Sequence, residues 1–264
     1  MTRLRIALAG ATGRMGRSMV GTIVESGDCV LTAAIVRGER KAADILAQSG
    51  ASVLVTSDPA RAIRDADAIV DFSTPRTSAD LAELAAREHV PHVLGTTGFS
   101  IEEERRIAGA AKQTAIVKSG NMSVGIALLA SFVRRAAAAL PDFDIEILEM
   151  HHRKKADAPS GTALLLGRAA AEGRNVRFED VSDARGERNG ARAENTIGFA
   201  SLRGGTVVGE HQAIFAGPHE RLALSHVAED RTIFARGALA AARWSQGKPA
   251  GLYSMQDVLG DLVL

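Results

Sequence analysis

The sequence predicts an α/β protein with two parts: a Rossmann-type domain with a parallel sheet, and an α+β domain with a mostly antiparallel sheet. A glycine-rich loop follows the first apolar run directly, as in dinucleotide-binding domains. Apolar runs and helical patterns then alternate to about residue 122, which is typical of a parallel sheet. Beyond residue 195, strand patterns follow one another with few helices between them. A length of 264 residues also suits two domains.

Composition limits the classes of function. Hydrophobic residues make up 46% of the chain and charged residues 24%, as in ordinary globular proteins. The formal net charge of +1 gives no sign of a nucleic-acid or membrane partner. The only cysteine, Cys29, fits a reducing cytoplasm, and Met1–Ala9 is too short for a signal peptide. The longest apolar stretch, Val124–Leu140, contains Arg134 and Arg135, so we expect a core helix there rather than a membrane span.

The first strand and helix frame the glycine loop. Leu4–Ala9 is a short apolar run that predicts a buried parallel strand, and a helical pattern follows to about Ser26. Between them, Gly10 permits a tight turn, Gly13 lets a pyrophosphate approach the backbone, and Gly16 lets the helix pack closely. The pattern therefore predicts a dinucleotide site, with an ordinary strand-to-helix turn as the alternative.

The end of the second strand bears on the choice of cofactor. This strand is expected over Val30–Val36, and NAD-binding folds usually carry an acidic residue near its end for the ribose hydroxyls. Here Val36 and Arg37 occupy that place, and Arg40 and Lys41 follow. A missing acid and an arginine favour a 2′-phosphate, hence NADP. The alternative is a surface arginine without a ligand.

Three polar segments follow the later strands of the predicted parallel sheet. The expected strands cover 53–56, 68–72, 92–95 and 115–118, and the expected helices cover 60–65, 77–89 and 101–113. Ligands of such sheets bind beyond the carboxyl ends of the strands, where Ser73-Thr74, Gly95–Thr97 and Ser119–Met122 lie. Each segment alone could be a plain turn, but together they suggest a nicotinamide pocket.

After residue 122 the pattern changes. We expect helices over 123–140 and 232–246, and the tail from residue 254 is compatible with another. The polar, glycine-rich segment 173–195 is predicted to be a mobile loop. Strand patterns at 196–203 and 206–215 flank Gly204-Gly205 and predict a hairpin, and Gly217-Pro218 turns the chain into a strand over 221–228.

The stretch Glu146–Ala163 has the highest density of reactive side chains. It reads EILEMHHRKKADAPSGTA, with two histidines and a basic triplet ahead of Ser160, a good N-cap for the Ala/Leu-rich run from Gly161 to Ala171. A helix N-terminus attracts anions, so the layout suits proton transfer to a small carboxylate substrate. A solvated basic loop and a simple helix cap are the alternatives. No metal site is expected, because adjacent histidines do not easily share one ion.

These motifs resemble one family along almost the whole chain. The matching strings are GATGRMG at 10–16, DFS at 71–73, GTTG at 95–98, SGNMSVG at 119–125, EMHHRKKADAPSGTA at 149–163, IGFASLRGG at 197–205, GEH at 209–211 and ERLALSH at 220–226. The chain is similar in these segments to the 4-hydroxy-tetrahydrodipicolinate (dihydrodipicolinate) reductases. The string at 149–163 is the most specific.

The resemblance implies an activity and a set of residues for it. The family reduces 4-hydroxy-tetrahydrodipicolinate, through the cyclic imine dicarboxylate dihydrodipicolinate, to tetrahydrodipicolinate in diaminopimelate and lysine biosynthesis. Hydride passes from NADPH or NADH to C4 of the substrate after loss of water. By position, His151 matches the family's proton donor and acceptor and Lys155 its proton-donating lysine. His152, Gly161 and Thr162 match its substrate ligands.

The resemblance also implies the cofactor contacts and the organisation of the chain. The matching cofactor residues are Gly10, Ala11, Thr12, Gly13, Arg14, Met15, Gly95, Thr96, Thr97, Ser119, Gly120, Asn121 and Met122, to which the strand argument adds Arg37. Val36 departs from the family, where many members carry an acid that binds the ribose. Residues 1–122 and 232–264 would form the dinucleotide-binding domain, and 123–231 the substrate-binding and oligomerisation domain of a cytoplasmic homotetramer.

Other functions need residues that this chain arranges differently. A short-chain dehydrogenase needs Tyr-x-x-x-Lys, but Asp257 lies four residues after the only tyrosine, Tyr253. A phosphorylating aldehyde dehydrogenase needs a nucleophilic cysteine, and Cys29 lies too early in the chain. A non-catalytic NADP sensor on the same fold remains a second hypothesis, against which the pair of His151 and Lys155 argues.

Overall fold

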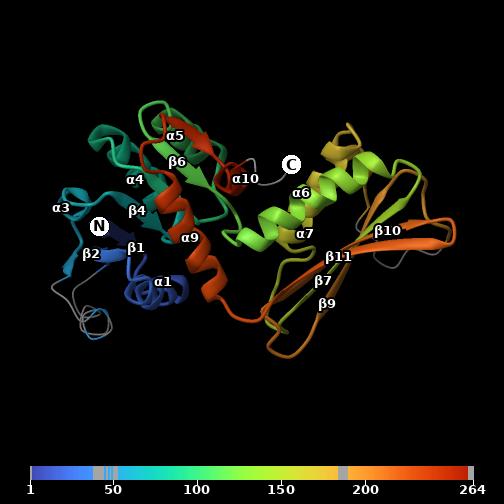
Figure 1. The fold of residues 1–264 in the computed structure, drawn as a ribbon, viewed down its shortest axis with the longest axis horizontal. Coiled ribbons are helices and arrows are strands. Elements are labelled where there is room, and N and C mark those ends of the chain that lie inside the picture. The colour runs from blue at the N-terminus through green and yellow to red at the C-terminus, as the bar shows by residue number, and fades with distance from the viewer. Residues whose placement is uncertain are drawn as a thin grey trace. The chain divides into compact units, whose positions relative to one another are not determined.

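The structure is a computed structural model that describes residues 2–37, 45, 47, 49, 53–183 and 190–260 (Figure 1). The chain divides into two compact units. Unit 1 comprises Met1–Val124 and Arg231–Gly260, and unit 2 comprises Gly125–Asp230. Arg40 and Lys41 lie outside the described residues.

A seven-stranded parallel sheet forms the centre of unit 1. Its order is β3-β2-β1-β4-β5-β6-β12. The strands are β1 (Leu4–Ala9), β2 (Cys29–Ile35), β3 (Leu54–Thr56), β4 (Ala68–Asp71), β5 (His92–Leu94), β6 (Ala115–Lys118) and β12 (Gly251–Tyr253). The chain moves outward from β1 to β3 and then crosses to β4. The carboxyl ends of β1 and β4 therefore form the switch point at which such sheets bind ligands.

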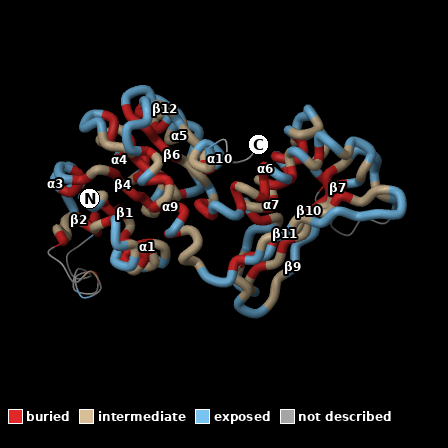
Figure 2. The backbone as a smooth tube through the Cα atoms, viewed as in Figure 1, coloured by how far each residue is buried: buried red, intermediate tan, exposed pale blue. Residues whose placement is uncertain are grey.

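Helices cover both faces of this sheet. They are α1 (Arg14–Glu25), α3 (Pro59–Ile63), α4 (Pro75–Glu88), α5 (Ile101–Ala110), α9 (Thr232–Trp244) and α10 (Met255–Leu259). Apolar residues of α3, α4 and α5 pack on one face, and α1 and α9 pack together on the other, so the strands are buried between them (Figure 2). At Gly237 on α9, a Cβ atom would stand 1.7 Å from the carbonyl oxygen of Met122. The glycine therefore lets α9, in the C-terminal segment, pack closely on the Met122 backbone of unit 1.

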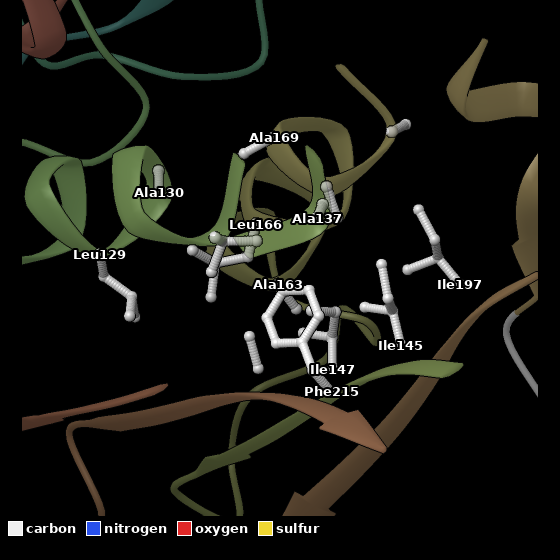
Figure 3. Packing of buried hydrophobic residues seen from close by; sticks show 14 of the residues in the cluster. Leu129, Ala130, Ala137, Ile145, Ile147, Ala163, Leu166, Ala169, Ile197 and Phe215 are labelled. Atoms are coloured by element: carbon white, nitrogen blue, oxygen red, sulfur yellow. The ribbon is translucent and has the colours of Figure 1, made fainter. Parts of the chain in front are cut away.

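A five-stranded mixed sheet forms the centre of unit 2. Its order is β11-β10-β7-β9-β8, and β10 is antiparallel to both of its neighbours, β11 and β7. The strands are β7 (Asp144–His151), β8 (Ser182–Asp183), β9 (Ile197–Arg203), β10 (Gly209–Gly217) and β11 (Glu220–Ala228), and the helices are α6 (Val124–Ala139), α7 (Gly161–Gly173) and α8 (Phe178–Val181). The core lies between α6, α7 and one face of the sheet, where Phe215 packs beside Ile147 and Ala163 (Figure 3). Both predicted fold classes are confirmed.

The predicted hairpin over 196–215 is wrong. Strand β7 lies between β9 and β10, parallel to β9 and antiparallel to β10. Gly204 and Gly205 instead wrap around the end of β7: the Gly204 N–H donates to the His151 carbonyl, and the Arg153 N–H donates to the Gly205 carbonyl. The strands themselves were predicted correctly. However, β7 pairs with a strand on each of its edges, and this pairing outweighs the local turn signal of Gly204-Gly205. The hairpin of this unit joins β10 to β11 through Pro218 and His219.

The segment 173–195 is more ordered than predicted where it is described. It contains α8 and β8, and β8 pairs with β9. Arg192 donates hydrogen bonds to Glu146, to Asp144 and to three backbone carbonyls. The short strand β12 was also missed, because three residues are too few for a periodic signal. No helix in the described parts of the chain is long and apolar enough to cross a membrane.

Candidate active site

The glycine loop between β1 and α1 has the shape of a dinucleotide cradle. Gly10 has a φ of +75°, and a Cβ atom there would stand 2.5 Å from the Phe72 carbonyl oxygen. A Cβ atom on Gly16 would stand 2.2 Å from the carbonyl oxygen of Gly10. Helix α1 begins after Gly13 with no side-chain cap and no acidic residue in its first turn. Its N-terminus therefore suits an anion such as a pyrophosphate.

A cavity of about 330 Å³ opens beside this loop, at the carboxyl end of the sheet. It is lined by Gly13, Arg14, Met15, Phe72, Ser73, Thr74, Pro75, Gly95, Thr96 and Thr97. The Phe72 ring fills the space that a side chain at Gly95 would need, since a Cβ atom there would stand 2.2 Å from the ring. The loop after β6 lies next to the cavity, since a Cβ atom added to Gly120 would stand 3.8 Å from the Thr97 methyl group. Two predicted contacts, Ala11 and Met122, are buried.

Arg37 lies at the rim of this region. One guanidinium nitrogen donates to the hydroxyls of Thr74 and Thr77, each at 3.2 Å, at the start of α4. Because Thr74 also lines the cavity, the exposed guanidinium of Arg37 lies close to the cavity. Val36, where an acid would bind the ribose, is 6% exposed and turned into the core.

Two buried polar residues support the loop after β4. The Asp71 carboxylate accepts the Ser73 N–H at 2.8 Å, and its other oxygen lies 3.3 Å from Nε2 of His92. Ser78 donates to the Thr96 hydroxyl at 2.8 Å and turns that side chain inward. Sequence reasoning missed this cluster, although an aspartate that ends an apolar strand was a usable signal.

In unit 2, strand β7 carries two ionisable side chains on its buried face. Ile145, Ile147, Glu149 and His151 alternate with more exposed neighbours, so all four point to the same side of the sheet. Glu149 is 1% exposed and His151 8%. A charged residue at a core position requires partners, because an unpaired buried charge is strongly unfavourable.

Glu149 has those partners on three sides. The two oxygens of its carboxylate accept a fork of hydrogen bonds from Arg203, both at 2.8 Å, and one oxygen also accepts the Ser160 N–H at 3.2 Å. The other oxygen lies 2.5 Å from Nδ1 of His151. Burial raises the pKa of Glu149, but hydrogen bonds from Arg203, His151 and Ser201 outweigh it and lower the pKa to about 2. Glu149 is therefore ionised near pH 7.

The orientation of His151 follows from this carboxylate. An ionised Glu149 can only accept, so Nδ1 of His151 donates and Nε2 is left for exchange of a proton. Burial lowers the pKa of His151, and the charges of Lys155 and Arg203 lower it further, against the opposing effect of Glu149. Gly209 leaves room at Nε2, since a Cβ atom there would stand 3.0 Å from that nitrogen.

His211 supports the start of α7. Its Nε2 lies 3.1 Å from the Ser160 hydroxyl, which also accepts the Ala163 N–H as the predicted N-cap. The His211 ring meets the His151 ring edge-on, with centroids 5.0 Å apart. Burial and the charge of His151 lower the pKa of His211 to about 4. A neutral His211 can accept the Ser160 proton and fix the helix start.

The remaining predicted residues surround this helix start. Gly161 is exposed, and a Cβ atom added to it would meet nothing within 4 Å, so packing alone does not explain the glycine. Thr162 follows in the first turn, and His152 is half-buried just after β7. Lys155 pairs with Asp157 at 2.8 Å between nitrogen and carboxylate oxygen. An imidazole, an ammonium group and a helix N-terminus thus lie near one another in unit 2.

Two family models match the chain. The description "Dihydrodipicolinate reductase, N-terminus" covers residues 4–122, and "Dihydrodipicolinate reductase, C-terminus" covers residues 125–259. The chain belongs to the dihydrodipicolinate reductase family.

Curated relatives and solved structures agree with this family. The 4-hydroxy-tetrahydrodipicolinate reductase of Methylocella silvestris is 53% identical over 98% of both chains, and that of Bartonella quintana is 52% identical over 97% of this chain and 98% of the relative. A dipicolinate-bound dihydrodipicolinate reductase from Paenisporosarcina sp. TG-14 superposes with a TM-score of 0.79 at 26% identity, over 98% of this chain and 100% of that one. GenD2 from gentamicin A biosynthesis, solved with NAD, shares the fold, with a TM-score of 0.63 at 13% identity over 98% and 91% of the chains.

Three residues of this reductase-family network have no predicted role. They are Glu149, Arg203 and His211, and all three fall inside motif strings of the family. Glu149 could have been found from its strand period, which places it on the face of Ile145 and Ile147. Arg203 and His211 gave no comparable signal, because their positions depend on how β9 and β10 pair with β7.

Proposed function

We propose that the chain reduces 4-hydroxy-tetrahydrodipicolinate, by way of dihydrodipicolinate, to tetrahydrodipicolinate with NADPH or NADH, as a step of diaminopimelate and lysine biosynthesis. Family membership gives the reaction. The geometric observation that carries the proposal is the buried pair of Glu149 and His151 beside the N-terminus of α7. That arrangement supports proton transfer beside an anion site, as a dicarboxylate substrate requires.

The residues of unit 2 bind the substrate and move its proton. The N–H groups of Gly161 and Thr162, with the Thr162 hydroxyl, bind one carboxylate at the helix start, and His152 contacts the same substrate. His151 accepts and returns a proton at Nε2, and Lys155 donates one. The dipicolinate in the Paenisporosarcina relative supports a planar dicarboxylate as the ligand.

The residues of unit 1 bind the dinucleotide. The start of α1 with Gly10–Met15 holds the pyrophosphate, and the glycines fit it because side chains there would collide with the backbone. The segments Gly95–Thr97 and Ser119–Met122 line the nicotinamide end. When bound, the cofactor supplies the hydride that reduces C4 of the substrate.

The functional assembly is a cytoplasmic homotetramer joined through the sheets of unit 2. The outer face of this sheet, opposite α6 and α7, carries Leu202 and Val227 with 49% and 59% of their surface exposed. They border a shallow cavity of about 170 Å³ together with Leu148 and Met150. An apolar surface of this kind suits burial against another copy. Light scattering on the purified chain measures the assembly, and a monomeric mass would contradict it.

A steady-state assay tests the proposed reaction. The reactive substrate is generated in situ, and oxidation of NADPH or NADH is followed by absorbance. We expect turnover with both cofactors and none without substrate. A chain that binds NADPH but never oxidises it would instead be the non-catalytic sensor.

Replacing Thr162 by valine is expected to weaken substrate binding. The change removes a hydroxyl that would bind a carboxylate, and a hydrogen bond to a charged group contributes roughly 1.5–3 kcal/mol. We expect KM to rise by about 10- to 150-fold while kcat changes little. Thr162→Ser retains the hydroxyl and serves as the matched control. An unchanged KM in Thr162→Val would mean that the residue belongs only to the helix.

Replacing Arg37 by alanine is expected to weaken NADPH binding selectively. The guanidinium that is held by Thr74 and Thr77 can pair with a 2′-phosphate through its planar fork of donors, worth roughly 1–3 kcal/mol. NADH lacks that phosphate and should bind almost as before. Arg37→Lys keeps the charge without the fork, so its loss should be intermediate. Equal losses for both cofactors in titrations would show that Arg37 does not recognise the phosphate.

A further inference from the structure

We propose that Glu149 and Arg203 are positioning residues for the proposed reaction, and that together they hold His151 in its reactive orientation. This inference rests on the proposed function of His151. It adds a role for two residues that touch neither cofactor nor substrate in the scheme above. The contacts that carry it lie entirely within unit 2.

The sheet brings the three side chains together by register. His151 at the end of β7 lies opposite Arg203 on β9. The two terminal nitrogens of Arg203 donate to the two oxygens of Glu149, both at 2.8 Å. One of these nitrogens also donates to the Asp157 carbonyl at 2.7 Å. This two-point contact allows one orientation of the carboxylate. Glu149 in turn allows one orientation of the imidazole, with Nδ1 2.5 Å away.

Orientation matters because the two ring nitrogens are chemically distinct. With the Nδ1 proton donated to Glu149, Nε2 is the nitrogen that can accept and return a proton. A flipped ring would present a carbon atom at that place. The absence of a side chain at Gly209 keeps the space beside Nε2 open. The network therefore fixes both the tautomer of the His151 ring and its orientation.

Glu149 also connects the proton-transfer group to the anion site. The oxygen that does not touch His151 accepts the N–H of Ser160, the N-cap of α7. One carboxylate thus sets the ring of His151 and the start of the helix that would hold the substrate. A shift of either relative to the other would require Glu149 to break a hydrogen bond.

The charged groups around His151 shift its pKa in opposite directions, and an experiment can separate these shifts. The groups that face it are Glu149 on the same strand, Arg203 on β9, His211 on β10 and Lys155 in the following loop. Glu149 raises the pKa of His151, whereas Lys155 and Arg203 lower it. Removing the carboxylate should therefore move the pKa of His151 in the opposite direction from removing the guanidinium.

A double-mutant cycle is the decisive measurement. We expect Glu149→Gln to lower kcat by about 10- to 100-fold, the scale on which removing a partner that orients a metal-ligating histidine lowers activity. In a His151→Gln background the same change should cost about 3-fold or less, because there is no imidazole left to orient. A purely structural role for Glu149 would give similar losses in both backgrounds and would overturn the proposal.

The pH profile supplies a second readout in variants that keep the fold. The limb of kcat/KM that disappears in His151→Gln should move to lower pH in Glu149→Gln and to higher pH in Arg203→Gln. Arg203→Lys, which keeps the charge, should stay near the wild-type limb with a smaller loss of kcat. If all three variants lose activity with an unmoved limb, the proposal is wrong.

Separate control measurements distinguish a loss of folding from a loss of function. The NADPH dissociation constant, which depends on unit 1, and the midpoint of thermal unfolding report whether each variant folds. If Glu149→Gln does not fold, the part-exposed Arg203 provides the test through the opposite pH shift. If wild type is inactive, or His151→Gln retains wild-type turnover, the proposed function fails instead, whatever the Glu149 variants show.

Discussion

Replacing His151 by glutamine is expected to lower kcat by about 10²–10⁴-fold, the usual contribution of a positioned proton-transfer group. Glutamine has a similar size and its amide can still donate to Glu149, so the network should persist. It cannot exchange a proton, however. Negative charge that develops on the substrate during hydride transfer would then have to be neutralised by solvent or by Lys155 alone.

Two measurements separate lost chemistry from lost structure. The NADPH dissociation constant of His151→Gln should equal that of wild type, because the glycine loop and its cavity belong to unit 1. His152→Gln is the matched neighbour: as a substrate ligand it should raise KM more than it lowers kcat. Turnover of His151→Gln within 3-fold of wild type, on the order of 0.7 kcal/mol of barrier, would remove His151 from the mechanism.

The elements of unit 1 were predictable because their signals are local. The run Leu4–Ala9, the glycines after it and the helix that follows lie next to one another in sequence, and each needs only its neighbours for interpretation. The same holds for Ser160, which caps α7 through a contact three residues away. Such features are fixed by backbone chemistry that the residue types determine.

Strand pairing in unit 2 was not predictable in this way. Gly204-Gly205 is a good turn signal, and two strands do flank it, yet β7 lies between them. The pairing is decided by burial of Ile145 and Ile147 against the helices, which involves contacts far apart in sequence. Since Arg203 and His211 reach Glu149 only through this pairing, the residue roles that depend on them could not be inferred first.

Replacing Lys155 by alanine is expected to lower kcat by about 10²–10⁴-fold as well, with NADPH binding unchanged. The partner of this lysine is exposed: Asp157 keeps 61% of its side-chain surface in contact with solvent. The ammonium lowers the pKa of Asp157 through their hydrogen bond. Exposed ion pairs contribute only about 0–1 kcal/mol, so a bound dicarboxylate can replace Asp157 easily.

The matched control for Lys155 is therefore Asp157→Asn. It removes the competing carboxylate and leaves the ammonium in place. Because an exposed ion pair contributes little free energy, kcat should stay within about 3-fold of wild type. Lys155→Arg keeps the positive charge but holds its proton too firmly to donate it. It should bind substrate nearly as well as wild type and turn it over far more slowly. If Lys155→Arg recovers full turnover, the lysine acts only by charge, and His151 alone transfers the proton.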